Sequence, residues 1–252
     1  MEQPSSGGTD YARYLLIDDL LRLQRPLTPG AHDELLFIVV HQAYELWFKL
    51  VVHELAHARD ELEAGRPHTA LPPLERVIAV WRLLMDQLTV LETMGPEGFL
   101  KFRDPLAPAS GFQSRQFREI EWLSGARERW VPSGDPPAGP SLWEAFCLAA
   151  RAQGIELPEG EGESARESRV AALAGLYLDH EGNAGRAALH AVAERLVDHD
   201  EGVVRWRFGH VLMASREIGA RPGTGGSRGV GYLQTTLEQR FYPELWAVRN
   251  VL

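Results

Sequence analysis

Residues 31–55, AHDELLFIVVHQAYELWFKLVVHEL, decide the fold of this chain. The stretch predicts one long helix with apolar side chains on nearly every face between residues 35 and 50, and such a helix is buried in a core. Its middle also carries four polar side chains, those of His41, Gln42, Glu45 and Lys49. Each polar group left alone away from water costs on the order of one to several kcal/mol. Other parts of the protein or a ligand must therefore satisfy them, and we expect Glu45 to pair with Lys49 one turn later.

Helical periodicity of apolar residues continues along the chain, and no segment shows the alternation of a strand. The predicted fold class is all-α, with one helical domain over residues 10–252. Residues 1–9 are small, polar and rich in glycine, so we expect them to be disordered. The short helix at residues 10–25 needs a surface to dock on, in this chain or in a neighbour. The other expected helices cover residues 31–64, 73–91, 116–125, 141–154, 164–179, 184–219 and 232–248, the last interrupted at Pro243.

Composition limits the classes of partner and compartment. A net charge of −9 over 252 residues argues against nucleic acid and against an anionic membrane surface. We expect no membrane span, because Glu45 and Lys49 interrupt the only long apolar run. The single cysteine, Cys147, excludes an internal disulfide and a cysteine-rich metal site. The N-terminus has no basic and apolar signal pattern, so a cytoplasmic protein is expected.

Histidines are the first candidates for chemistry. His53, Glu54 and His57 spell HELAH, a match to the HExxH pattern that places two zinc ligands and a general base on one helix face. No third ligand follows nearby and the helix turns polar here, so a solvated face is the favoured interpretation over a zinc hydrolase. His41 and His210 each lie on an apolar helix face, where a histidine is most often a satisfied core residue. A single histidine on a helix is also a common haem ligand.

Two further segments could bind a ligand. Arg118 lies in GFQSRQFREIEWLSG, residues 111–125, where its planar guanidinium could bind a carboxylate through two parallel bonds; the alternative is an intramolecular pair with Glu121. The glycine-rich stretch GTGGSRGVG, residues 223–231, departs from phosphate-binding patterns. Its hydroxyl groups, on Thr224 and Ser227, could instead belong to a mobile loop that closes over a small ligand, or the stretch could be a plain surface loop.

Four separated segments together carry a family resemblance: YARYLLIDDLL, LFIVVHQAYELWFKL, FRDPLAPASGFQSRQFREIE, and GTGGSRGVGYL followed by FYPELWAVR. From about residue 11 to residue 249 the chain resembles the tryptophan 2,3-dioxygenase family of haem proteins. Membership implies a helical bundle enclosing haem b, a homotetramer, and insertion of O₂ across the indole C2–C3 bond of L-tryptophan to give N-formylkynurenine, in tryptophan catabolism by the kynurenine pathway. An alternative is a relative that monooxygenates a tryptophan derivative, such as a methylated one, and another is a haem sensor without turnover. The linker at residues 126–140 is shorter than is usual in the family.

The resemblance also implies roles for individual residues. His210 matches the proximal ligand of the haem iron, oriented by a hydrogen bond on its second nitrogen. His41 matches the catalytic distal histidine that hydrogen-bonds the indole N–H, and Phe37 matches the apolar wall beside the indole. Arg118 would bind the substrate carboxylate and Thr224 the amino-acid end. Two pairs complete the predicted site: Ser124 and Gly125, close to the haem, and Tyr11 and Tyr14, which would reach into the pocket of a neighbouring subunit.

Overall fold

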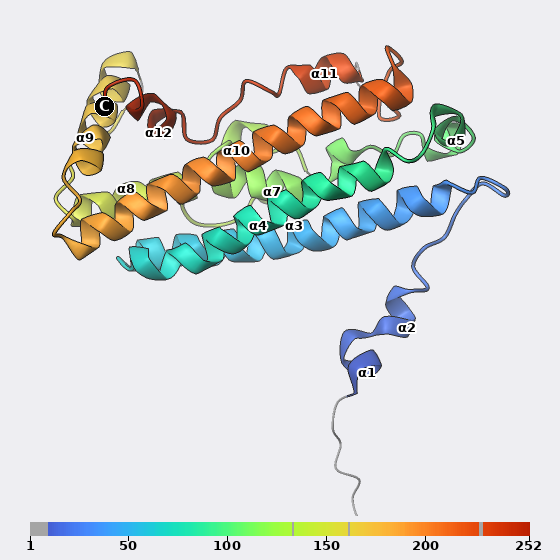
Figure 1. Cartoon of the computed structure of the whole chain (residues 1–252), viewed down its shortest axis with the longest axis horizontal. Helices are drawn as coiled ribbons and strands as arrows, with labels where there is room; N and C mark the ends of the chain where they lie inside the picture. Colours follow the sequence, from blue (N-terminus) through green and yellow to red (C-terminus); the bar gives the residue numbers. More distant parts are fainter. Residues whose placement is uncertain (1–9, 133, 161, 227–228) are drawn as a thin grey trace, which may run out of the picture.

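Three long helices form the body of the molecule: α3 (Glu34–Glu63), α4 (Pro67–Leu91) and α10 (Ala184–Ile218) (Figure 1). The structure is a computed structural model that describes residues 10–132, 134–160, 162–226 and 229–252. Every regular element within those residues is a helix, which confirms the all-α prediction. Residues 1–9, where disorder was expected, and Ser227 of the glycine-rich loop lie outside the described residues.

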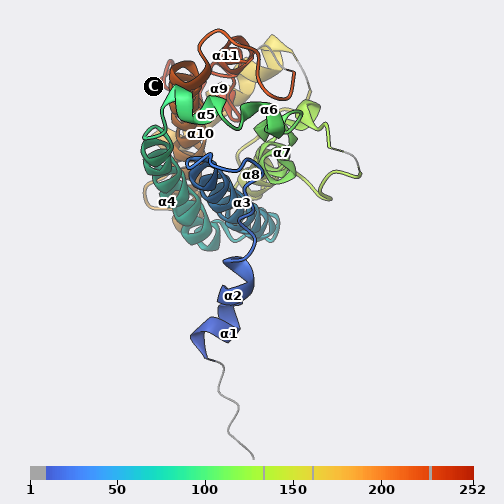
Figure 2. The ribbon, with the colours of Figure 1, turned by 90° about the vertical axis from the view of Figure 1, so that its right-hand side faces the viewer.

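Shorter helices surround this body. α7 and α8 pack against α3, while α9 and α12 lie together at one end of the long helices (Figure 1). Seen along the bundle, α1 and α2 project away from it as an arm with no buried residue (Figure 2). The remaining bounds are α1 (Tyr11–Leu15), α2 (Ile17–Leu20), α5 (Pro96–Leu100), α6 (Arg103–Leu106), η1 (Gly111–Gln113), α7 (Arg115–Ser124), η2 (Arg127–Arg129), α8 (Leu142–Ala152), α9 (Glu163–Leu178), α11 (Val230–Gln234) and α12 (Pro243–Val248).

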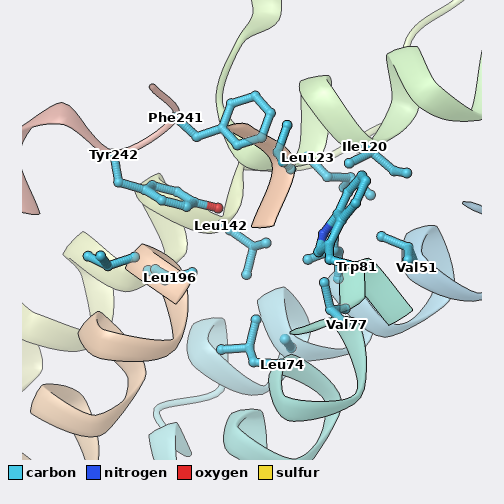
Figure 3. Close-up of a cluster of buried hydrophobic side chains, with 14 of the residues drawn as sticks. Val51, Leu74, Val77, Trp81, Ile120, Leu123, Leu142, Leu196, Phe241 and Tyr242 are labelled. Carbon is cyan, nitrogen blue, oxygen red and sulfur yellow. The ribbon is translucent and has the colours of Figure 1, made fainter. Parts of the chain in front are cut away.

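Two glycines of α10 allow it to lie close against α4. A Cβ atom added at Gly202 would lie 3.0 Å from Cβ of Trp81, and one added at Gly209 would lie 2.8 Å from a methyl group of Leu88. The glycines are seven residues apart, as are their partners, so the two helices run in the same direction with these residues along their contact. Side chains of α3, α4, α7, α8 and α10 meet around Trp81 and fill the core beside this contact (Figure 3).

α3 is long and apolar enough to cross a membrane by length and composition alone, which corrects the expectation that no run would qualify. The core helix of a soluble protein meets the same criteria, so the finding is weak evidence for a membrane span. α3 turns back into the antiparallel α4 and packs against it, with the hydroxyl of Tyr44 donating to the carbonyl of Leu84 at 2.7 Å. Only one face of α3 is buried against the other helices, whereas Leu35, Val39 and Leu46 are 48%, 47% and 54% exposed, so the expectation that the helix is buried on nearly every face was wrong.

Three expected helix bounds were wrong. α4 begins at Pro67 rather than after Pro73, because a proline in the first turn needs no hydrogen-bond partner for its nitrogen. The N-terminal helix is divided at Leu16, where φ is 52°. The C-terminal helix is interrupted over residues 235–242 rather than at Pro243 alone, because backbone amides and carbonyls of this segment form hydrogen bonds with side chains of α10. Asp200 of α10 accepts from the amides of residues 241 and 242, and Arg207 of α10 donates to the carbonyls of residues 236 and 239.

Candidate active site

A cavity of about 570 Å³ lies between α3, α4, α7 and α10, within the size range of small-molecule sites. Its walls are mostly aromatic and aliphatic, and residues of segments 103–114, 223–224 and 229–236 line one side. Five residues that the sequence singled out separately all line it: Phe37, His41, Arg118, His210 and Thr224. They come from α3, α7, α10 and the loop before α11, so only the tertiary fold brings them together.

His41 is held as a neutral hydrogen-bond acceptor. Its Nδ1 lies 2.7 Å from the carbonyl oxygen of Phe37, one turn earlier on α3. A carbonyl can only accept, so Nδ1 carries the proton and donates it, and Nε2 keeps its lone pair. Burial lowers the pKa of His41 and outweighs the opposite effect of that hydrogen bond. The Phe37 ring packs on the imidazole with their centroids 3.9 Å apart, which fixes its orientation.

His210 presents a second neutral imidazole to the same cavity. Burial is the main cause that lowers its pKa to about 4, with His41 as a smaller one. Trp206, one turn earlier on α10, stacks on the ring at 5.4 Å between centroids and 16° between planes. The expected hydrogen bond to a second ring nitrogen is not found within the described part of the chain, so this stacking orients the ring instead. A neutral imidazole with a free lone pair is the form that binds a metal.

Arg118 forms the intramolecular pair with Glu121 that was one of the two arrangements considered from the sequence. Its Nη1 donates to Glu121 Oε2 at 2.5 Å, while its Nε is buried without a hydrogen-bond partner. The side chain is 7% exposed and burial lowers the pKa of its guanidinium, although Glu121 acts in the opposite direction. A buried cation with an unused donor is costly. Arg118 also lines the cavity, so it gives this part of the wall a positive charge.

Thr224 belongs to a loop that is tied to the opposite side of the cavity entrance. Its hydroxyl donates to the carbonyl of Ala109 at 2.6 Å, and Arg103 Nη2 donates to the carbonyl of Pro222 at 2.6 Å. Gly225 lies so close to Ser110 that an added Cβ would lie 2.5 Å from its Cβ, which requires glycine there. These contacts hold segments 103–110 and 222–225 together across the entrance.

The other predicted site residues lie elsewhere. Tyr11 and Tyr14 are 77% and 75% exposed on the projecting arm. Gly125 ends α7 with φ at 113° and does not line the cavity. Ser124 is fully buried, and its hydroxyl lies 2.9 Å from Nε2 of His199 in a polar cluster next to the core.

Two sequence hypotheses on α3 have clear structural outcomes. In the HELAH segment His53 and His57 are exposed, while Glu54 is paired with Arg76 at 2.6 Å. No group of three metal-binding side chains is found among the described residues, so the solvated-face interpretation is favoured. The expected pair of Glu45 with Lys49 was wrong, because Glu45 Oε2 instead accepts from Gln116 Nε2 of α7 at 2.9 Å.

Sequence reasoning missed a cluster of charged residues in the cavity wall. Arg129 and Arg207 both donate to Glu121 Oε1, at 2.6 and 2.9 Å, opposite the oxygen that binds Arg118. All four residues line the cavity. Only the spacing of Arg118 and Glu121 on one helix was visible in the sequence; the other two arginines come from η2 and α10.

Comparison with known proteins agrees with this geometry. The family model described as tryptophan 2,3-dioxygenase matches residues 1–133 and 146–252 and skips part of the linker before α8. A protein named tryptophan 2,3-dioxygenase from Anaeromyxobacter sp. (strain K) is 44% identical over 100% of both chains. Proteins of the same name from Nocardioides sp. and Caulobacter vibrioides are 42% and 39% identical, over 96% of this chain and 94% and 98% of their own. The family model and these relatives match the chain along nearly its whole length, and the helices bring the matching segments around one cavity. The chain therefore belongs to the tryptophan 2,3-dioxygenase family.

Proposed function

We propose that this protein is a haem-dependent dioxygenase that inserts both atoms of O₂ across the indole C2–C3 bond of L-tryptophan and yields N-formylkynurenine, in tryptophan catabolism. The observation that carries the proposal is the content of the cavity: two neutral imidazoles and the guanidinium of Arg118, in walls that are mostly aromatic and aliphatic. A zwitterionic indole amino acid offers a matching N–H, an apolar ring and a carboxylate. The names of the relatives support the same reaction.

The residues of the cavity fit haem b as the cofactor. His210 would hold the iron, because its imidazole is neutral and no hydrogen bond within the described residues occupies a ring nitrogen. Trp206 stacks on it and Phe48 lies edge-on to Trp206, so the surrounding wall is the apolar, aromatic surface that a porphyrin requires. Haem supplies the oxygen chemistry, and the protein supplies binding, orientation and exclusion of water.

His41 and Phe37 would orient the indole. The free lone pair of His41 Nε2 accepts the indole N–H, since Nδ1 is already committed to the Phe37 carbonyl. The Phe37 ring, which also packs against Phe99 and Phe102, provides a rigid apolar surface for the indole ring. A site that pairs the indole N–H discriminates against analogues without it, because the buried acceptor would lose its partner.

Arg118 and Thr224 would bind the amino-acid end. The guanidinium of Arg118, which lines the cavity, would donate to the carboxylate in a charge-assisted hydrogen bond. The hydroxyl proton of Thr224 is already donated to Ala109, so its oxygen can only accept, and the ammonium group is the matching donor. The contacts that join segments 103–110 and 222–225 would keep water out once the substrate is bound.

The N-terminal arm supports a homo-oligomer, with the tetramer of the family as the proposed state. Tyr11, Tyr14 and the leucines beside them are largely exposed, and α1 and α2 are too short to be stable alone. A neighbouring subunit would bury this apolar surface, with both tyrosines at its pocket. Ser124 and Gly125 would lie near the haem without lining the cavity. Each chain would form one helical domain, and the assembled enzyme would be cytoplasmic.

Aerobic incubation of the reduced, haem-loaded protein with L-tryptophan tests the proposal through product mass. We expect a product that has gained two oxygen atoms. A gain of one atom would refute dioxygenation and favour a monooxygenase, and haem binding without any product would favour a sensor. Loss of haem absorbance in His210→Ala, with helical content retained, is the expected control result for the ligand assignment.

A further inference from the structure

One buried carboxylate organises three arginines in the cavity wall. Glu121 is 1% exposed, and it accepts hydrogen bonds from Arg118 of α7, Arg129 of η2 and Arg207 of α10. Oε2 of Glu121 accepts from Arg118, and Oε1 accepts from Arg129 and Arg207. Three cations against one anion leave a surplus of positive charge in a space with little water.

We propose that Glu121 is the positioning residue of the carboxylate subsite: it fixes the rotation of Arg118, so that the guanidinium is held in the cavity wall for the substrate. The inference rests on the proposed function, because it concerns how the amino-acid carboxylate is recognised. Glu121 itself has no contact with substrate in this scheme. It acts through Arg118, whose planar group binds a carboxylate well only when its donor edge is correctly turned.

The surroundings of Arg118 show why the carboxylate of Glu121 determines the orientation of its guanidinium group. The guanidinium carbon lies 4.9 Å from the ring centre of Phe112 and 5.3 Å from that of Phe117, so two aromatic rings flank the group. Aromatic contacts attract the cation but leave it free to rotate in its own plane. The hydrogen bond from Nη1 to Glu121 is the only one that the Arg118 side chain makes within the described residues, and it removes that freedom.

Substitution of Glu121 by glutamine should disturb this arrangement selectively. The amide keeps one acceptor oxygen, but its nitrogen is a donor and would face an arginine donor on one side. The three guanidinium groups also lose their shared anion and repel one another. Arg118 should then rotate away from its position, while His41 and Phe37, on α3, keep the geometry of the indole end.

Two ligands separate the carboxylate subsite from the rest of the cavity. L-tryptophan and tryptamine share the indole and the ammonium group, and only L-tryptophan carries a carboxylate. We expect titration calorimetry on the anaerobic haem-loaded protein to show tighter binding of L-tryptophan by the wild type. In Glu121→Gln this preference should fall at least tenfold while the affinity for tryptamine stays unchanged. Glu121→Asp, which keeps the charge but is one methylene shorter, should lose part of the preference.

Glu119→Gln is the matched control, because Glu119 lies on the same helix in a more exposed pair with Arg115. It should leave the affinities for both ligands unchanged. A wild type that binds the two ligands equally would refute the carboxylate contact of the proposed function. A wild type that prefers L-tryptophan, with the same preference kept in Glu121→Gln and Glu121→Asp, would overturn the role of Glu121 alone. Equal loss of both ligands would also overturn it, because that result indicates general damage to the cavity.

Discussion

Acidification should destabilise this fold through His199, a histidine of α10 that has no exposed surface. Trp81 Nε1 donates to His199 Nδ1 at 3.0 Å, so Nδ1 is the acceptor and the proton resides on Nε2. Nε2 then donates to the hydroxyl oxygen of Ser124 at 2.9 Å. Both nitrogens are used by the neutral ring, and a second proton would break the bond from Trp81. Burial, with the charge of Arg207 as a smaller cause, lowers the pKa of His199 to about 3.

The size of the effect follows from the difference between folded and unfolded pKa. An unfolded histidine titrates near pH 6.5, so the unfolded chain takes up a proton at a pH where folded His199 does not. The stabilising effect of the neutral ring is complete above pH 6.5 and is lost progressively as the pH falls toward 3. Linkage gives a loss of about 2 kcal/mol between pH 7.5 and pH 5.0 from this single group.

The free energy of unfolding in urea, measured at both pH values for wild type and His199→Gln, isolates this contribution. Other histidines also titrate, but they do so in both proteins, so the comparison removes them. Protein concentration and haem content must be held fixed, because association and ligand binding alter apparent stability. The wild type should be the more stable protein at pH 7.5, and its advantage should shrink by about 2 kcal/mol at pH 5.0. An advantage that is the same at both pH values would refute the assignment of His199 as a buried neutral residue.

Three further predictions follow from the packing and the site. Gly202→Ala should lose about 1 kcal/mol of stability because its methyl group meets Trp81 at 3.0 Å, whereas Gly175→Ala on α9, with open space around it, should gain up to about 1 kcal/mol. Thermal melts that show both variants stabilised to the same extent would contradict the close packing at Gly202. The acid-side midpoint of the pH profile of kcat/KM for L-tryptophan should lie below the 6.5 of an ordinary histidine, because burial lowers the pKa of His41 and its neutral form is required. A midpoint above 6.5 contradicts this. Deletion of residues 1–24 should shift the sedimentation profile to smaller species without loss of helical content, and an unchanged profile would argue against the arm as an oligomer contact.

The fold was predictable where local pattern and tertiary structure agree. The apolar run of α3 and the long periodicity of α10 predicted helices whose bounds differ from the observed ones by three residues or fewer. The start of α8 is likewise marked locally, by a capping box of Ser141 and Glu144, and it lies within one residue of the expected position. Prediction failed at residues 235–242, where the helical pattern of the sequence continues but the side chains of Asp200 and Arg207 form hydrogen bonds with the backbone. Side chains so distant in sequence leave no local trace of such a contact.

The site was predictable only through the combined pattern. On spacing alone His41 and His210 were ordinary core histidines and HELAH was the stronger match to a known site. The structure reverses that order, because it encloses the first two histidines in one cavity and leaves the histidines of HELAH on the surface. Arg129 and Arg207 could not have been assigned from the sequence, since their relevance depends on a carboxylate on another helix.

The polar groups inside α3 now have a physical explanation that extends to the whole cavity. His41 Nδ1 donates to the Phe37 carbonyl and Glu45 accepts from Gln116, so each of these polar groups of α3 has a hydrogen-bond partner, and His41 Nε2 keeps a free lone pair. Other residues of the cavity lining, Arg103, Arg118, Trp206 and Glu217, each have a buried polar atom without a hydrogen-bond partner, and the guanidinium of Arg118 carries a positive charge. One end of the cavity is thus neutral and accepts a hydrogen bond, and the other is cationic and donates one. A ligand satisfies both only if an N–H on an apolar ring and a carboxylate are held a fixed distance apart, and this requirement, more than the volume of the cavity, favours an indole amino acid.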